Sequence, residues 1–400
     1  MFEIKPIFSA LLRSKSGPLL IILQLALTLA VVANASHIIQ ERLELMARDT
    51  GIAESELIGF TVSEMLMDKD FISQRRQDEQ ALRAIPGVID ASASNQIPLT
   101  NSGSSTTISS SLEDNGVDLN IGYFQGNEHL FTTLGLTLVE GRTFTANDIM
   151  TDFKLGALPT QVMLSRYAAE LYFPGESAVG KQVYLRDTPI EVIGVYDRLQ
   201  TPWAQRSHTY ASALIPMENA SFFARYLVRA EAGQRDAVLK QIEETLLKVD
   251  PDRVISGLRT FDQIRQRAYR NDNAMAKMLG VVIVLLLVVT ALGVVGLASY
   301  SVGQRRKQIG TRRALGATRT AIVRHFLTEN LMVCLAGVLL GSLGAVALSQ
   351  YLMTHYELTR LPLFYLWTTL AGLVLLSQLA AAAPALRAAR ISPALATRSV

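Results

Sequence analysis

The chain has 400 residues, of which 49% are hydrophobic and 18% charged, and its formal net charge is +3. This composition excludes extended disorder and indicates a membrane protein. Residues 40–273 carry 23 Lys and Arg against 32 Asp and Glu, whereas the rest of the chain carries 15 against 3. An acidic block between basic, apolar flanks is not the profile of a nucleic-acid-binding protein. The single cysteine, Cys334, excludes an internal disulfide and a cysteine-cluster metal site.

Residues 1–17 predict a short helix lying in the cytoplasmic membrane interface. Apolar residues recur there at helical spacing: Phe2, Ile4, Ile7, Phe8, Leu11 and Leu12. Lys5 and Arg13 stand between them, and the glycine and proline at positions 17 and 18 end the pattern. A plain extension of the first span is the alternative, which Pro6 makes less favourable.

Four charge-free stretches, 18–39, 278–302, 330–353 and 361–386, are long enough to cross a bilayer, which requires about 20 apolar residues. With their flanks they predict transmembrane helices over 18–39, 274–302, 326–353 and 361–386. The basic flanks lie before the first helix, over 303–325, and over 387–400, so these segments are expected in the cytoplasm. Segments 40–273 and 354–360 then lie outside. The predicted fold class is a membrane protein with four transmembrane α-helices and a large α+β extracytoplasmic domain between helices 1 and 2.

The first span has a second interpretation, because Ala33-Asn34-Ala35 also fits the cleavage motif of a signal peptide. The apolar run is long for such a peptide and the basic segment before it is extended, which favours a retained helix. The domain lies outside in either case.

The extracytoplasmic segment 40–273 is large enough for two subdomains. Helices are expected over 73–85, 127–134, 165–173 and 234–247, the third capped by Ser165. Strands are expected over 117–124, 161–164, 181–186, 190–196, 210–216, 224–230 and 254–260. The Ser- and Thr-rich stretch 101–111 predicts a mobile loop or an edge hairpin.

No motif in the chain predicts catalysis or metal binding. Residues 175–181 approach a phosphate-binding loop, but Gln182 stands where Ser or Thr is needed and a strand is expected where the motif needs a helix. A glycine turn joining helix to strand is the favoured interpretation. The five histidines are scattered, and neither a nucleophile elbow nor HExxH occurs. We therefore expect a non-enzymatic chain without a cofactor, although a hydrolase built from carboxylates of the external domain remains an alternative.

Small residues within the spans predict close helix packing, in the bundle or in a dimer. They are Gly293 and Gly296 in the second span, and Gly337, Gly341 and Gly344 in the third. Glu329, at the cytoplasmic end of the third span, is expected to pair with a nearby arginine. The absence of a chain of ionisable residues across the spans argues against a proton-coupled carrier.

The segment 303–325 alternates basic clusters with small residues and has glycines at positions 310 and 316. It predicts a helical segment with a turn at Gly316 and Ala317 that presents an arginine face and an apolar face. Membrane topology and contacts with lipid head groups account for the arginines. They do not account for the apolar run 314–317, which suits docking into a groove on a partner protein.

The run 308–317 resembles the cytoplasmic motif of FtsX/MacB-type ABC transporter permeases, and the likeness continues through 322–324, 326–329 and 389–395. In the external domain, stretches 123–124, 134–136, 140–144, 168–173, 179–181 and 193–195 are similar to the MacB-type periplasmic core. The resemblance implies that a cytoplasmic ATPase is contacted by Gln308, Ile309, Gly310, Arg312, Arg313, Ala314, Leu315, Gly316 and Ala317. Two positions depart from the family pattern: Gln308 replaces a common Glu, and Ser392 a common Asp.

The resemblance also implies partners and a function. MacB carries a fused nucleotide-binding domain and this sequence has none, so a separate ATPase is expected to bind ATP and Mg²⁺. The expected assembly is a homo- or heterodimer of inner-membrane permeases with two ATPase subunits. It would transmit ATP-driven motion to the periplasmic domain for efflux of a drug, peptide or similar compound, with an adaptor and an outer-membrane channel as further partners. The alternatives are mechanotransmission without cargo, which activates a cell-wall hydrolase or extracts lipoproteins, and a membrane-anchored receptor.

Overall fold

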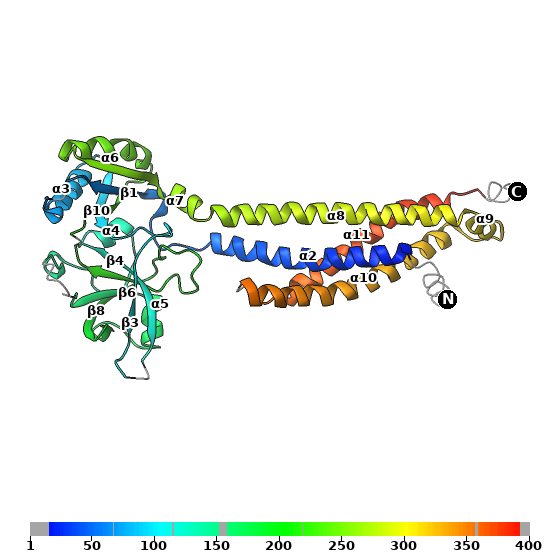
Figure 1. Ribbon diagram of the computed structural model, residues 1–400, viewed down its shortest axis with the longest axis horizontal. Coiled ribbons are helices and arrows are strands. Elements are labelled where there is room, and N and C mark those ends of the chain that lie inside the picture. Colours follow the sequence, from blue (N-terminus) through cyan, green and yellow to red (C-terminus); the bar gives the residue numbers. More distant parts are fainter. Residues whose placement is uncertain are drawn as a thin grey trace. The chain divides into compact units, whose positions relative to one another are not determined.

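The computed structural model describes residues 16–66, 68–113, 116–151, 158–218, 220–356 and 359–392 (Figure 1). The chain divides into two compact units, one formed by Met1–Glu44 with Asp272–Val400 and the other by Leu45–Asn271. We call the first the helical unit and the second the extracytoplasmic domain. The interfacial helix predicted over 1–17 lies almost wholly outside the described residues, as does the tail after residue 392.

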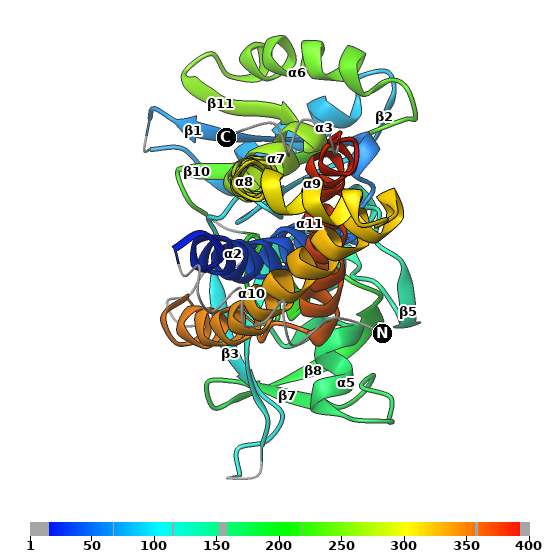
Figure 2. The same ribbon diagram turned by 90° about the vertical axis from the view of Figure 1, so that its right-hand side faces the viewer.

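The helical unit contains α2 (Ser16–Met46), α8 (Arg270–Gln304), α9 (Arg306–Ala314), α10 (Arg319–Tyr356) and α11 (Leu363–Ala389). All except α9 are long and apolar enough to cross a membrane, which confirms the four predicted transmembrane helices. These helices run past the charge-free stretches, since charged residues at their ends are compatible with helix. In Figures 1 and 2, α2 lies between α8 and α10.

The extracytoplasmic domain contains two sheets. The first is antiparallel, with the order β11-β1-β10-β2. Its strands are β1 (Leu57–Glu64), β2 (Val88–Ser94), β10 (Phe223–Ala230) and β11 (Arg253–Thr260). Helices α3 (Phe71–Arg83) and α6 (Arg235–Val249) pack on it through an apolar cluster that includes Leu82, Tyr226 and Ile242.

The second sheet is mixed, with the order β5-β8-β6-β9-β4-β3-β7. Its strands are β3 (Ser105–Ser109), β4 (Asp118–Gly126), β5 (Leu138–Gly141), β6 (Gln161–Ser165), β7 (Gln182–Leu185), β8 (Thr188–Tyr196) and β9 (Ser212–Pro216). Because β7 pairs with both β3 and β8, six of these strands form a closed circuit and β5 is left at an edge. The remaining short elements are η1 (Glu54–Glu56), α4 (Leu130–Leu134), η2 (Ala146–Asp148), α5 (Arg166–Tyr172) and α7 (Phe261–Ala268).

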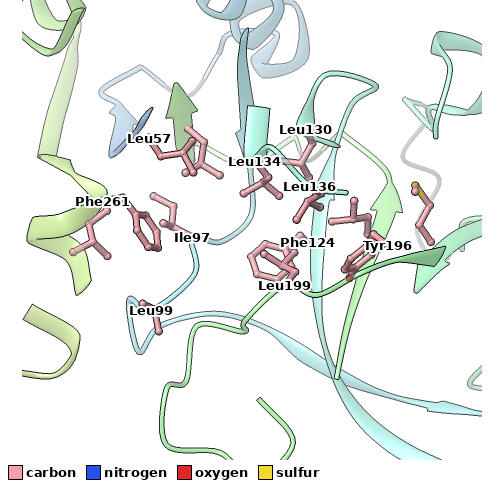
Figure 3. Packing of buried hydrophobic residues seen from close by; sticks show 14 of the residues in the cluster. Leu57, Ile97, Leu99, Phe124, Leu130, Leu134, Leu136, Tyr196, Leu199 and Phe261 are labelled. Atoms are coloured by element: carbon pink, nitrogen blue, oxygen red, sulfur yellow. The ribbon is translucent and has the colours of Figure 1, made fainter. Parts of the chain in front are cut away.

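One apolar cluster joins the two sheets of the domain. Leu57 of β1 and Phe261 of α7 belong to it together with Phe124 of β4, Leu134 of α4 and Tyr196 of β8 (Figure 3). All five side chains are fully buried. The Tyr196 hydroxyl donates a hydrogen bond to Ser212 Oγ at 2.9 Å, so its polar atom is satisfied inside the core. This cluster therefore connects the two sheets, while each sheet also has an apolar cluster of its own.

Several predicted elements of the domain are confirmed. Ser165 caps α5 by accepting a hydrogen bond from the Ala168 N–H at 3.3 Å. Gly175 and Gly180 have positive φ angles in the turn between α5 and β7, so the phosphate-loop near-match is a glycine turn. The prediction of a mobile loop over 101–111 is wrong for β3, because that strand pairs with β4 and β7. The alternative, an edge hairpin, is correct for the antiparallel pairing with β4 but not for the edge position, since β3 has a partner on each side.

Candidate functional site

The turn that follows α9 is built around a glycine. The Gly316 N–H donates to the Arg313 carbonyl at 3.2 Å, and the Ala317 N–H donates to the Arg312 carbonyl at 3.0 Å. This is the hydrogen-bond pattern of a Schellman motif, which satisfies the last carbonyls of a helix. Gly316 has a φ of 94°, a backbone conformation that a residue with a β-carbon rarely adopts. The predicted turn at Gly316 and Ala317 thus has a local chemical cause.

One face of α9 is packed against the ends of the membrane helices. Ile309 and Gly310 are buried, and Ile309 belongs to an apolar cluster with Ile322 and Phe326 of α10 and Ala388 of α11. We call this cluster the α9 base. It means that a force applied to α9 acts on the ends of α10 and α11.

The other face of α9 is open. Gln308, Arg312, Ala314 and Leu315 are exposed, and Leu315 is 84% exposed at the tip of the turn. Arg313 is half-buried instead, and its Nη1 donates to the Ala317 carbonyl at 3.4 Å. The structure therefore separates two adjacent arginines: Arg312 lies on the open face with Leu315, while Arg313 braces the turn.

An ion pair connects the beginning of this segment to α10. Arg305, between α8 and α9, donates from Nη1 to Oε2 of Glu329 at 2.7 Å. The two side chains are 25% and 12% exposed. The expectation that Glu329 pairs with a nearby arginine is confirmed.

The structure places the glycines of the third span against α2. A β-carbon built on Gly337 would lie 2.9 Å from the Leu25 Cβ, and one on Gly341 would lie 2.8 Å from the Ala26 Cα. At Gly344 the nearest atom, the Ala30 Cβ, would be 3.6 Å away. Close approach of α10 to α2 thus depends on Gly337 and Gly341, because small residues let helix backbones meet.

The two glycines of the second span differ. A β-carbon on Gly293 would collide with the side-chain amide of Gln24, whereas one on Gly296 would meet no described atom within 4 Å. Gly293 faces α2. Gly296 does not take part in a tight contact among the described residues of this chain.

Hydrogen bonds that the sequence did not predict also join α2 to its neighbours. Gln24 Nε2 donates to the Val289 carbonyl of α8 at 2.9 Å, and the hydroxyls of Thr28 and Thr290 lie 2.9 Å apart. Asn34 Nδ2 donates to the Ala345 carbonyl of α10 at 3.0 Å. Since the partners are more than 260 positions apart, only the fold reveals them.

Each unit also contains contacts between the two chain segments that lead to and from the other unit. Within the extracytoplasmic domain, Arg265 of α7 donates from Nη2 to the carbonyls of Met46 and Arg48, both at 2.7 Å, and its Nη1 pairs with Glu54. Within the helical unit, Arg42 of α2 and Asp272 of α8 form an ion pair of 2.9 Å. Incoming and outgoing segments are therefore tied together inside each unit.

Within the described parts of the chain, no three His, Cys, Asp or Glu side chains come together as a metal site. The candidate site therefore consists of the exposed turn after α9, the α9 base, and the bonds that join α2 to α8 and α10.

Two family profiles match the chain. Residues 21–245 match the MacB-like periplasmic core domain, and residues 280–393 match the C-terminal part of FtsX-like permeases.

Curated proteins similar to this chain include macrolide export ATP-binding/permease proteins named MacB. The one from Yersinia pestis bv. Antiqua is 31% identical over 236 residues, which are 56% of this chain and 32% of the relative. The one from Neisseria gonorrhoeae is 25% identical over 264 residues, or 65% of this chain and 39% of the relative. The chain thus spans less than two fifths of the length of these relatives.

Two solved structures resemble part of the chain. The periplasmic region of MacB from Actinobacillus actinomycetemcomitans has 17% identity and a TM-score of 0.36, covering 56% of this chain and 97% of that one. The extracellular domain of the ABC-type transporter YknZ from Gram-positive bacteria has 19% identity and a TM-score of 0.33, covering 50% and 100%.

Proposed function

Because this chain belongs to the FtsX/MacB-type ABC transporter permeases, we propose that it converts the motion of a separate cytoplasmic ATPase into motion of its periplasmic domain. Permeases of this family are multi-pass inner-membrane proteins that work with ABC ATPase partners. In this proposal ATP and Mg²⁺ are bound by the partner, and the permease itself carries no catalytic residue.

The observation that carries the proposal is the turn after α9. Leu315 offers an exposed apolar anchor, Arg312 provides a charged rim, and Ile309 fixes the helix to the α9 base. A protruding apolar side chain with a charged border suits a groove on a partner, where a buried anchor supplies most of the binding energy. The ATPase is the partner that we assign to this surface.

The bonds of α2 support the transmission step. Gln24 and Thr28 connect α2 to α8, while Asn34, Gly337 and Gly341 connect it to α10. Helices connected in this way move as a body rather than one at a time. Changing a two-state population from 1:99 to 99:1 takes about 5.5 kcal/mol of differential binding. The ATP-bound partner would have to supply that difference through its contacts with α9.

Efflux is the outcome that we favour. The similar curated proteins are named for macrolide export, which supports a drug-like or peptide cargo taken up on the periplasmic side. Such an exporter would act as a dimer of permeases, homo- or heteromeric, and would pass its cargo to an adaptor and an outer-membrane channel.

Mechanotransmission without cargo is a second candidate, and one observation favours it. Three polar side chains of α2, those of Gln24, Thr28 and Asn34, are engaged in hydrogen bonds between helices. Polar groups used for packing are not available to conduct a solute through the membrane. In this case the moving domain would activate a cell-wall hydrolase or extract lipoproteins.

A photocrosslinking amino acid at position 308 of the full-length chain, on the open face of α9, tests the proposal. We expect an ATP-hydrolysing subunit to be crosslinked and to co-purify in mild detergent, and Leu315→Asp to abolish both results. Leu112→Asp is the matched control, since Leu112 is 60% exposed in the periplasmic domain and should change neither. A chain that exports normally without any crosslinked ATPase would contradict the proposal. A co-purified adaptor would support efflux, and a cell-wall hydrolase would support the second candidate.

A further inference from the structure

The helical unit contains a cavity of about 500 Å³ that the proposed function does not use. Each long helix contributes to its wall, with Ile21 from α2, Leu297 from α8, Val333 from α10 and Ala381 from α11. The volume is typical of small-ligand sites, which range from about 300 to 1,000 Å³. The cavity can therefore hold a ligand and not merely a water molecule.

The cavity is apolar at one end and charged at the other. Leu297 precedes Arg305 by about two helical turns, and Val333 follows Glu329 by about one, so the apolar residues lie deeper in the membrane. Arg305 and Glu329, the ion pair of 2.7 Å, line the cytoplasmic end. This change from apolar to charged residues along the cavity matches the change from acyl chains to head groups along a bilayer leaflet.

The ion pair supplies both signs of charge. Arg305 has five N–H donors, of which its bond to Glu329 uses one, and the Glu329 carboxylate has further lone pairs. A head group with a phosphate and a primary ammonium matches this pair, because the phosphate can accept from Arg305 and the ammonium can donate to Glu329. A purely anionic head group would bring its charge next to Glu329. A choline head group has no N–H to donate.

We infer that this cavity binds an ethanolamine phospholipid of the cytoplasmic leaflet, with an acyl chain among Ile21, Leu297 and Val333 and the head group at Arg305 and Glu329. Phe326 lines the cavity and also belongs to the α9 base. A lipid bound there contacts the structure on which α9 rests. The inference does not depend on which partner binds α9.

Native mass spectrometry of the delipidated full-length chain tests this inference. The chain is incubated with ethanolamine, choline or glycerol phospholipids of identical acyl chains. We expect the ethanolamine lipid to be retained about tenfold better than the other two, a preference equivalent to one hydrogen bond to a charged group. Equal retention of all three, or a preference for the anionic glycerol lipid, would overturn the inference.

Two sets of variants locate the binding. Arg305→Gln combined with Glu329→Gln removes both charges and should abolish the preference while a lipid is still retained. Ala298→Phe should narrow the cavity and reduce retention of every lipid, because Ala298 lines its wall. Ala291→Phe, at a half-buried position of the same helix outside the lining, is the control and should bind like the original chain. If the variant without both charges kept the same lipid preference as the original chain, the lipid would have to lie elsewhere.

Residues 1–15 are the competing occupant, since only Ser16 separates them from Gly17, which lines the cavity. If those residues filled the cavity, their deletion would create strong lipid retention that the full-length chain lacks. That result would overturn the inference. Equal retention with and without them supports it.

Discussion

The side-chain amide of Gln24 occupies the space that the missing β-carbon of Gly293 leaves on α8. From this position Gln24 donates to the Val289 carbonyl. The contact between α2 and α8 thus depends on glycine at position 293, because the polar side chain of Gln24 lies opposite it.

We therefore expect Gly293→Ala to displace Gln24 and weaken the contact between α2 and α8. Alanine favours helix over glycine by about 1 kcal/mol, so an unobstructed glycine should gain stability when substituted. Gly296→Ala is the control for that gain, since its β-carbon would have open space. Thermal unfolding of the two variants in detergent should show the Gly296 variant as the more stable. Equal melting temperatures would contradict the arrangement of α2 and α8.

The same reasoning applies to Gly341 of α10, where the obstacle is the backbone of α2. A β-carbon on Gly341 would lie 2.8 Å from the Ala26 Cα, which cannot turn aside. Gly341→Ala should force the helices apart and cost about 1–3 kcal/mol of stability. Gly344→Ala should be tolerated, because its nearest neighbour would be at 3.6 Å. Unfolding measured in the same detergent for both variants checks the difference.

The turn at Gly316 should tolerate few residues. Gly316→Pro removes the N–H that bonds to Arg313 and forbids the positive φ, so the turn after α9 should be lost. We expect ATP hydrolysis by the partner to continue while export stops. Gly316→Asn is the milder variant, because asparagine accepts this conformation, and it should retain part of the activity. Normal export by the proline variant, at normal expression, would show that the turn is not needed for coupling.

The two arginines before this turn should behave differently. Arg312→Glu changes an exposed charge and should weaken the association with the ATPase while the fold keeps its stability. Arg313→Glu replaces a half-buried side chain that bonds to the Ala317 carbonyl and should lower the melting temperature instead. Co-purification and thermal unfolding, measured on both variants, separate these effects.

The stability of the periplasmic domain should depend on pH through Glu79. Burial raises the pKa of Glu79 to about 7 from 4.5, against the lowering effect of hydrogen bonds from the Ala93 N–H and Asn127 Nδ2, both at 2.6 Å. Between pH 4.5 and about 7, the folded state therefore keeps a proton on Glu79 that the unfolded state has already lost. The free energy of unfolding should fall as pH rises from 4.5 to about 7, by on the order of 3 kcal/mol from this group, and change little on either side.

Glu79→Gln, which cannot titrate, should flatten that slope. Thermal unfolding of the full-length chain at intervals from pH 4.5 to 8 measures it in both proteins. An identical slope in the variant would mean that another group is responsible.

The sequence predicted the elements that depend on composition along the chain. Charge-free length revealed the four spans, and the glycine after a run of helix formers revealed the turn at Gly316. The sequence did not reveal β1, because its first four residues, Leu57 to Phe60, are all buried and only its second half alternates apolar and polar residues. The short strand β5 is exposed at all four positions and was missed for the opposite reason.

Partners at long range could not be predicted from one sequence. Thr28 and Thr290 each look like an unremarkable residue in an apolar run, and only their proximity gives them a role. Gly293 and Gly296 have the same local appearance, yet one contacts α2 and the other has open space. Spacing identifies small residues, whereas the helix surface opposite each of them decides its function.

The bonds of Arg265 to Met46 and Arg48 have a consequence for how such proteins diversify. They hold the entrance of the periplasmic domain to α7, which directly precedes its exit, so the domain begins and ends at one place. A segment whose ends meet can be exchanged for another without redesigning its surroundings. The region 45–271 is in this sense a cassette, and grafting it between related permeases should transfer the specificity of one to the membrane helices of another.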